Sequence, residues 1–197
     1  MVPPRLARPP QGQLPEVAFL AWEEPLFRIQ DAETLAYKRY PGPKHRFDAP
    51  AGEYATVYTN DSRIGVFAEV YVDAGRRLGE EDEGRHLVEF APRVSLPVID
   101  LLSEDTLREF KLDERISTGE DYERCQQWAL KLHDQCPEVR GIRYGARCAG
   151  RSTANVALFA ERCADSLQVH SLGHLGALEE TVLEAADRYG LTVPFLA

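Results

Sequence analysis

The chain has 197 residues, of which 44% are hydrophobic and 28% charged, an ordinary composition for one globular domain. Its formal net charge of −9 and its pI of about 5.1 exclude the clustered positive field of a phosphate-backbone binder, so we expect no direct nucleic-acid partner. No apolar run approaches the ~18 residues of a membrane span, so we expect no membrane partner either.

The first sixteen residues, MVPPRLARPPQGQLPE, are rich in proline and lack the apolar stretch of a secretory signal. This composition predicts a mobile tail over residues 1–16 and a single domain over residues 17–197. The four cysteines, Cys125, Cys136, Cys148 and Cys163, have no zinc-site spacing. We therefore expect reduced thiols in a cytoplasmic protein, with no metal.

Two early strands are predicted over residues 17–22 and 26–30. The Pro/Gly-rich segment YPGPKHRFDAPAGEY follows, and it is too long and too polar for a tight turn. Loops of this kind often carry functional residues. A third strand is predicted over residues 54–59, because polar and apolar residues alternate there.

A helix is predicted over residues 61–73, with Asn60, Asp61 and Ser62 as N-cap candidates. On a helical wheel Glu69 lies in a narrow polar sector with apolar surface on both sides. A solvent-facing glutamate is one interpretation, and a carboxylate that lines a cleft is the other. If Glu69 is buried, it needs a cationic partner or a wet pocket, because an isolated buried charge costs several kcal/mol.

The rest of the chain mixes strands and helices without regular alternation, which favours an α+β fold over a doubly wound sheet. We expect strands over residues 86–90 and 97–101, in GIRYGARCAG, in NVALFAE and in VHSL, and an edge strand in LTVPFLA. Ser103 is expected to cap a short helix, and Thr118 with Asp121 to form the capping box of another. A last helix, about residues 174–189, is expected to end at Gly190. No dinucleotide fingerprint or P-loop is present.

Four motifs carry a resemblance to a known family, and they occur in a fixed order: LFRI, HRFD, ATVYT and FAEV. Their characteristic residues are Arg28, Arg46 with Phe47, Tyr58 and Glu69. This series resembles the RES domain family, named for arginine, glutamate and serine. DYERCQQWALKL, GIRYGAR and NVALFAERC resemble the second half of its larger members, so the resemblance covers roughly residues 26–163.

The resemblance implies a fold similar to the ADP-ribosyltransferases: a compact α+β domain with two small sheets around an NAD cleft and flanking helices. Many members are toxins of RES–Xre toxin–antitoxin pairs. They consume NAD as NAD phosphorylases or NAD glycohydrolases and release nicotinamide, and Xre-type antitoxins block the cleft. NAD would then be a substrate rather than a cofactor, with inorganic phosphate as a co-substrate in phosphorolysis. A homo-oligomer stays open.

The roles that the resemblance implies suit the chemistry of the residues. Glu69 would stabilise the positive charge that develops on the ribose when the nicotinamide bond breaks. Arg46, the second catalytic candidate, and Arg28 would bind the diphosphate or an incoming phosphate. Tyr58 would contact the ribose or the ring, and Phe47 would form a wall. Alternatively, Arg28 pairs with a surface carboxylate and Tyr58 is a core residue.

The sequence departs from the family at Ala146, where related proteins commonly carry the serine. Ser152 and Asn155 are candidates to replace its hydroxyl, Arg147 is a further candidate for binding NAD, and Glu123 and Arg124 are other contributors. The departure leaves open the rate, the acceptor (water or phosphate) and a weakened RES-like domain that only binds a partner. Because the same cleft could transfer ADP-ribose, an ADP-ribosyltransferase that modifies a macromolecule is a further alternative.

Overall fold

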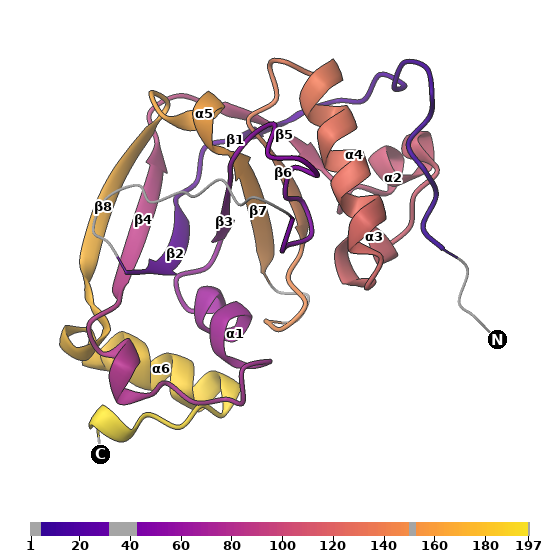
Figure 1. The fold of residues 1–197 in the computed structure, drawn as a ribbon. Helices are drawn as coiled ribbons and strands as arrows, with labels where there is room; N and C mark the ends of the chain where they lie inside the picture. Colours follow the sequence, from indigo (N-terminus) through magenta and orange to yellow (C-terminus); the bar gives the residue numbers. More distant parts are fainter. Residues whose placement is uncertain (1–4, 32–42, 150–152, 197) are drawn as a thin grey trace.

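The computed structural model describes residues 5–31, 43–149 and 153–196 (Figure 1). Within these ranges eight strands form one sheet in the order β1-β5-β6-β7-β3-β2-β4-β8. The strands are β1 (Leu20–Trp22), β2 (Leu26–Gln30), β3 (Thr56–Asn60), β4 (His86–Pro92), β5 (Leu96–Asp100), β6 (Gly141–Gly145), β7 (Ala154–Phe159) and β8 (Leu167–His174). All neighbours are antiparallel except β5 and β6.

The resemblance implied two small sheets, but the structure has one continuous sheet. It is continuous because β3 pairs on one edge with β7 and on the other with β2. The second junction is short. Along β2 and β3 only Phe27 and Asn60 are register partners, whereas β2 pairs with β4 along its full length. The sheet therefore forks between β2 and β3, and the α+β class is as expected.

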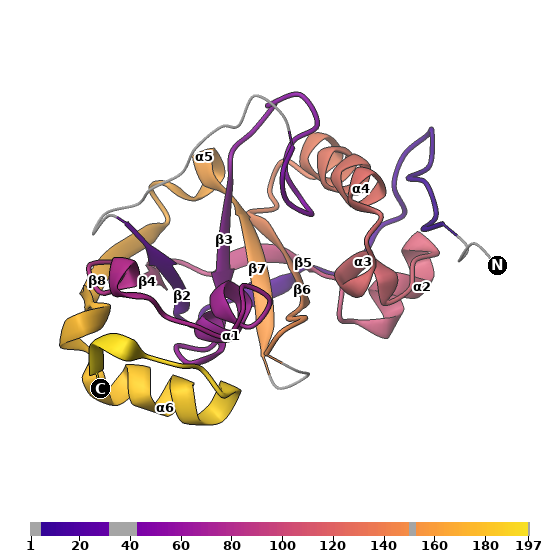
Figure 2. The ribbon, with the colours of Figure 1, turned by 60° about the horizontal axis from the view of Figure 1, so that its bottom comes forward.

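Six α-helices pack around this sheet in the described ranges: α1 (Gly65–Tyr71), α2 (Glu104–Phe110), α3 (Arg115–Thr118), α4 (Tyr122–Gln135), α5 (Ala160–Cys163) and α6 (Glu179–Tyr189). Three short 3₁₀ turns are η1 (Glu80–Asp82), η2 (Leu175–Ala177) and η3 (Pro194–Leu196). Helices α2, α3 and α4 lie together on one side, and α1 and α6 lie at the other end, as Figure 2 shows from a second direction. None of the helices in these ranges has the length and apolar character to cross a bilayer.

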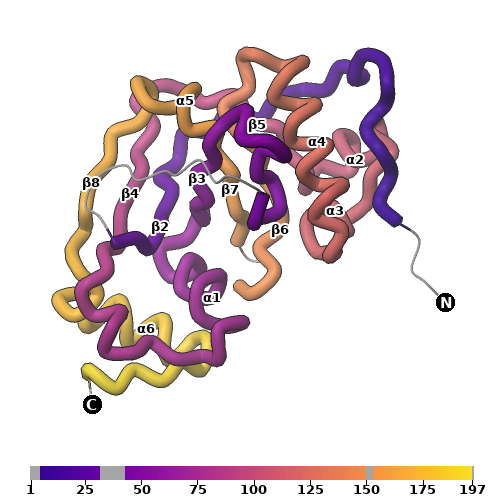
Figure 3. The backbone as a smooth tube through the Cα atoms, in the orientation of Figure 1, coloured from indigo at the N-terminus to yellow at the C-terminus, as the bar shows by residue number. Residues whose placement is uncertain are grey.

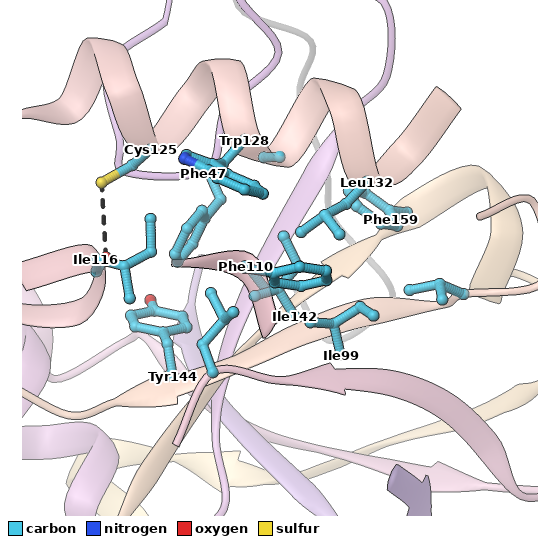
Figure 4. Packing of buried hydrophobic residues seen from close by; sticks show 14 of the residues in the cluster. Phe47, Ile99, Phe110, Ile116, Cys125, Trp128, Leu132, Ile142, Tyr144 and Phe159 are labelled. Atoms are coloured by element: carbon cyan, nitrogen blue, oxygen red, sulfur yellow. Dashed lines mark hydrogen bonds between the residues drawn. The ribbon is translucent and has the colours of Figure 1, made fainter. Parts of the chain in front are cut away.

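Helix α4 packs on the sheet with one apolar face. Its residues Cys125, Trp128, Ala129 and Leu132 are buried against Ile142 of β6 and its neighbours (Figure 4). These four α4 residues recur at helical spacing, so burial of one face stabilises the helix through tertiary packing. A second cluster packs Ile64, the N-cap of α1, and Phe67 and Tyr71 of α1 on α6 and β2.

Several element boundaries differ from the sequence-based expectation. Thr118 does not cap α4: it ends α3, and its Oγ1 donates to Glu114 O at 3.1 Å. Asp121 is the N-cap, with Oδ1 accepting from Arg124 N at 3.4 Å. The expected last strand is the 3₁₀ turn η3, with one isolated bridge between Arg77 and Thr192.

Other boundaries agree with expectation. Ser103 caps α2, and Gly190 ends α6 in the left-handed region with φ of 63°.

The described part of the N-terminal segment runs beside α4 and α2 (Figure 3). Leu6 is buried in the α4 cluster, Trp128 Nε1 donates to Ala7 O at 2.8 Å, and Leu14 N donates to Gln135 Oε1 at 2.8 Å. These contacts fix residues 6–14 to the surface of α4 in the structure. The mobility that composition suggests for residues 1–16 stays a prediction.

Candidate active site

A pocket of about 400 Å³ opens at the fork between β2 and β3. Six of the seven predicted site residues line it, and they come from elements between β2 and β7: Arg28, Arg46, Tyr58, Glu69, Arg147 and Asn155. The volume lies in the range of small-molecule sites. The fold therefore brings six residues from between positions 28 and 155, far apart in sequence, to one concave site.

Glu69 faces this pocket from the middle of α1, half-buried. Its Oε1 accepts from Cys148 N at 2.8 Å and from Ala149 N at 3.3 Å, and its Oε2 accepts from Asn155 Nδ2 at 2.8 Å. None of the ion pairs in the described part of the chain involves Glu69. Fixed N–H donors and a wet pocket compensate the charge instead of an arginine.

A line of amide side chains holds Asn155 in turn. Asn155 Oδ1 accepts from Asn60 Nδ2 at 2.7 Å, and Asn60 Oδ1 accepts from Ser62 N at 2.8 Å. Asn60 and Asn155 are register partners on β3 and β7, so the pair is a cross-strand contact. Gly65 allows the close approach, because a Cβ there would lie 2.5 Å from Asn60 Oδ1.

This relay orients the amide toward Glu69. Asn60 is not the N-cap of α1 that the sequence suggests, because Ile64 occupies that position. Its side chain serves the relay instead.

Arg46 is a buried cation in the pocket wall, with 6% of its surface exposed. Its Nη1 donates to Ile116 O at 3.2 Å and to Cys125 Sγ at 3.6 Å, and its guanidinium lies 4.8 Å from the ring centroid of Tyr122. Among the described residues no carboxylate forms an ion pair with Arg46. Since a buried charge requires compensation, this arrangement suits a site for an anionic ligand.

The HRFD loop is folded by Asp48, a buried residue that the sequence analysis missed. Asp48 Oδ2 accepts from Lys44 N at 2.9 Å and His45 N at 2.7 Å, while Oδ1 accepts from Tyr58 OH at 3.0 Å. Tyr58 OH also accepts from Phe47 N at 2.9 Å. Burial, and then the Asp48 charge, raise the pKa of Tyr58 well above its usual value. The hydroxyl therefore anchors the loop, and the ring lines the pocket.

Phe47 does not form a pocket wall, contrary to the expected role. Its side chain is 0% exposed and packs edge-on against Tyr144, with 4.8 Å between the ring centroids (Figure 4). The chain turns at Arg46 and Phe47, and Asp48 N donates to His45 O at 3.3 Å to close the turn. The two side chains therefore point to different sides: Arg46 to the pocket and Phe47 to the core under α4. The motif alone does not show that the two side chains point to different sides, because this depends on the geometry of the turn.

The remaining predicted residues lie at the rim or outside. Arg28 is half-buried on β2, and the exposed Arg147 pairs with Asp73, which also lines the pocket. Glu123 and Arg124 do not contribute to the lining. Instead, Glu123 Oε1 accepts from Gln127 Nε2, and Arg124 Nη1 donates to Gln127 Oε1.

Ala146, where the resemblance leads us to expect the family's serine, is 8% exposed and packs with Ala68 and Ala149 outside the pocket. Ser152 lies outside the described residues. Asn155 is in place, but its amide holds Glu69.

Ser117, Tyr144 and Cys148 are among the pocket residues that the sequence did not predict. Burial, and then the Glu69 carboxylate, raise the pKa of Tyr144, so it stays a neutral phenol near pH 7. The same two causes, in that order, raise the pKa of the Cys148 thiol to about 11, so it is not a thiolate nucleophile. All four cysteines are free thiols, and the described residues contain no cluster of three metal-ligating side chains.

The fold and the pocket define a small α+β protein with a cleft that presents arginines and a fixed carboxylate. The RES domain family model matches residues 25–178, most of the chain. The chain therefore belongs to the RES domain family.

A comparison with curated proteins found no match. The fold is similar to a chain in the crystal structure of the M. tuberculosis MbcT–MbcA toxin–antitoxin complex, with a TM-score of 0.58 and 20% identity over 82% of this chain and 90% of that chain.

Proposed function

We propose that this protein is the toxin of a toxin–antitoxin pair and that it consumes NAD by cleaving the nicotinamide–ribose bond. The observation that carries the proposal is the pairing of two features in one pocket. Glu69 is held by three N–H donors, and Arg46 is a buried cation without a carboxylate partner among the described residues. A fixed anion and an available cation are what a positively charged ribose and an anionic diphosphate require.

In the proposed reaction the bond between the ribose C1′ and the nicotinamide nitrogen breaks, and nicotinamide leaves with the electron pair. An oxygen of inorganic phosphate or of water forms the new bond to C1′. Phosphate gives ADP-ribose 1″-phosphate, and water gives ADP-ribose after it loses a proton. The positive charge on the ribose is greatest between these two events.

Glu69 is suited to stabilise that charge. A carboxylate offers about four acceptor positions, and the three N–H donors occupy two on Oε1 and one on Oε2. One position on Oε2 is left for a ribose hydroxyl, and the negative charge lies beside the developing positive charge. The donors also fix the carboxylate before the substrate binds, so little reorganisation is needed during the reaction.

The arginines are suited to bind the phosphate groups. Arg46 lies deep in the wall, whereas Arg28 is half-buried and Arg147 lies at the rim. A planar guanidinium can contact two phosphate oxygens at once. This gradation favours a ligand that extends from the wall to the rim, as the diphosphate and adenosine part of NAD does.

The direct test is to incubate the purified protein with NAD and measure free nicotinamide. We expect release by the wild type and a loss of about a hundredfold or more in kcat for Glu69→Gln, with the fold retained. Glu180→Gln, at an exposed glutamate of α6, is the matched control and should be fully active. Equal turnover by Glu69→Gln would remove Glu69 from the mechanism.

Two product analyses separate the finer alternatives. A requirement for inorganic phosphate, with ADP-ribose 1″-phosphate as the product, identifies an NAD phosphorylase, and free ADP-ribose identifies a glycohydrolase. Mass spectrometry of protein and nucleic acid after the reaction tests for an ADP-ribosyltransferase. A labelled macromolecule in stoichiometric yield would replace our proposal with transfer, and absence of NAD binding at millimolar concentration would favour a partner-binding domain.

The proposed partner is an antitoxin protein of the Xre type that covers the pocket in the cytoplasm. The proposal of this partner rests on the family resemblance and on the toxin–antitoxin complex that contains the similar chain. Co-expression with the product of a neighbouring reading frame, followed by co-purification and the nicotinamide assay, tests it. A partner that co-purifies without lowering NAD cleavage would contradict a blocked pocket.

A further inference from the structure

Ser117 lies beside the buried cation of the pocket. It belongs to α3, and it follows Ile116, whose carbonyl oxygen accepts from Arg46 Nη1 at 3.2 Å. The Ser117 side chain is only 4% exposed, and it lines the pocket. Helix α3 therefore contributes the Ser117 hydroxyl to the pocket wall, and through Ile116 O it also contacts the Arg46 guanidinium in that wall.

The Ser117 hydroxyl is fixed in place, but its proton has no acceptor among the described residues. Its Oγ accepts from Gly145 N at 3.1 Å, and no hydrogen bond donated by Ser117 Oγ occurs in those residues. A hydroxyl can accept and donate at the same time. Gly145 lies close, since a Cβ at that position would be 3.4 Å from Ser117 Cβ. This contact positions Oγ and leaves its O–H for a ligand.

The family's serine position does not supply such a group here. Ala146 has no hydroxyl, and its side chain packs with Ala68 and Ala149 outside the pocket. Ser117 comes from a different element and lies 29 residues before Ala146 in the chain. Ser117 lines the pocket, and its O–H has no acceptor among the described residues. The neighbouring Arg46 has no ion pair within the same ranges.

We propose that the Ser117 hydroxyl and the Arg46 guanidinium together bind one anionic phosphate oxygen. This inference rests on the proposed function for the identity of the ligand. The oxygen belongs either to the diphosphate of NAD or to inorganic phosphate, and both offer the same chemistry to the two donors. A charged oxygen fits better than a neutral carbonyl, because the neighbouring guanidinium is buried and a charge-assisted pair is the stronger one.

Calorimetric titration of the full chain tests the inference without any need for turnover. Wild type and Ser117→Ala are titrated with ADP-ribose, with inorganic phosphate and with nicotinamide. We expect Ser117→Ala to bind one of the two anions about tenfold or more weakly, because a hydrogen bond to a charged group is lost, and to bind nicotinamide as the wild type does. Weaker ADP-ribose binding assigns the oxygen to the diphosphate, and weaker phosphate binding assigns it to the free anion.

Two further variants separate a binding role from a structural one. Ser117→Cys keeps the approximate shape but has a weak S–H donor, so it should show the same selective loss. Thr118→Ala removes the neighbouring hydroxyl, which donates to Glu114 O inside α3, and should bind all three ligands normally. Thermal unfolding of each variant verifies that it is folded.

Three results would overturn the inference: unchanged anion affinity in Ser117→Ala, equal weakening of all three ligands, or no anion binding by the wild type. Failure of the proposed function looks different. Wild type that binds the anions but does not release nicotinamide from NAD would refute the proposed reaction and leave the role of Ser117 in anion binding intact.

Discussion

The amide of Asn155 donates from Nδ2 to Oε2 of Glu69 across 2.8 Å, and the two residues belong to different elements, β7 and α1. Asn155 is held by Asn60, and Asn60 by the backbone of Ser62. The position of the carboxylate is therefore fixed by the sheet as well as by its own helix. This relationship leads to the first prediction.

Asn155→Asp should lower the rate of NAD cleavage at neutral pH by about tenfold or more. It replaces an N–H donor with a second carboxylate next to Glu69, and like charges raise the pKa of one member of such a pair. Because a raised pKa delays ionisation, activity should recover as the pH rises. The pH profile of kcat measures this, and Asn155→Ala, which adds no charge, should be impaired without that shift. Overlapping profiles of the two variants would contradict the relay.

Arg46→Met should abolish anion binding with little effect on stability. The substitution removes a buried cation that has no ion pair among the described residues, so the lost hydrogen bond to Ile116 O is offset by the relief of desolvation. We expect ADP-ribose affinity to fall by about a hundredfold, and the free energy of unfolding in urea to change by about 1 kcal/mol or less. Arg63→Met, at an exposed site, is the control. A loss of several kcal/mol would assign Arg46 to the framework.

Tyr58→Phe should act on stability more than on catalysis. The hydroxyl bridges Asp48 Oδ1 and Phe47 N, so its removal leaves two polar groups unpaired, which costs about 1–3 kcal/mol. The ring still lines the pocket, so KM for NAD should stay close to that of the wild type. Tyr58→Leu removes the ring as well and should raise KM. If Tyr58→Phe lost activity at unchanged stability, the hydroxyl would have a direct role in the reaction.

Arg162→Met should destabilise the protein by about 2–4 kcal/mol without altering the site. Its guanidinium donates to His133 O at 2.6 Å, Cys136 O at 2.9 Å and Val139 O at 3.0 Å, which are carbonyls at the end of α4 and just beyond it. Urea unfolding measures the loss, with Arg108→Met on the exposed face of α2 as the matched control. Nicotinamide release at low temperature should be unchanged.

Stability should fall steadily above pH 9. Burial raises the pKa of the Cys163 thiol from 9.0 to about 12, so the folded protein keeps a proton that the unfolded chain releases near pH 9. The folded state therefore binds more protons in this window, and stability is lost at about 1.4 kcal/mol per pH unit for each such group. Urea unfolding from pH 8 to 11 tests the slope, which should be shallower in Cys163→Ala. Equal slopes would exclude Cys163 as a contributor.

Local patterns predicted the elements well where one residue pattern dominates. The strand over residues 26–30 matches β2, Ser103 caps α2, and Gly190 ends α6. The buried residues of α4 recur at helical spacing, because burial of that face stabilises the helix. The wrong start of α4 arose because Thr118 and Asp121 satisfy the capping-box pattern while α3 occupies the preceding residues.

The site was predictable only in part, because its geometry depends on contacts between distant residues. The series Arg28, Arg46, Tyr58 and Glu69 indicated the pocket in the correct order. Asp48 was missed because its role is to accept backbone N–H groups, a role that many loop aspartates lack. Ser117 was missed because only the packing of α3 on Gly145 brings it to the pocket.

The pairing of β2 with β3 at one register position has a consequence for how this site can change. The pocket opens here because the hydrogen-bonded pairing of β2 with β3 stops, so the path of the main chain creates the space. The space does not depend on small side chains. Substitutions along the two diverging strands can therefore alter which ligand is accepted while the opening itself persists. A variant that extended the ladder by two positions would instead remove the site altogether, whatever its side chains were.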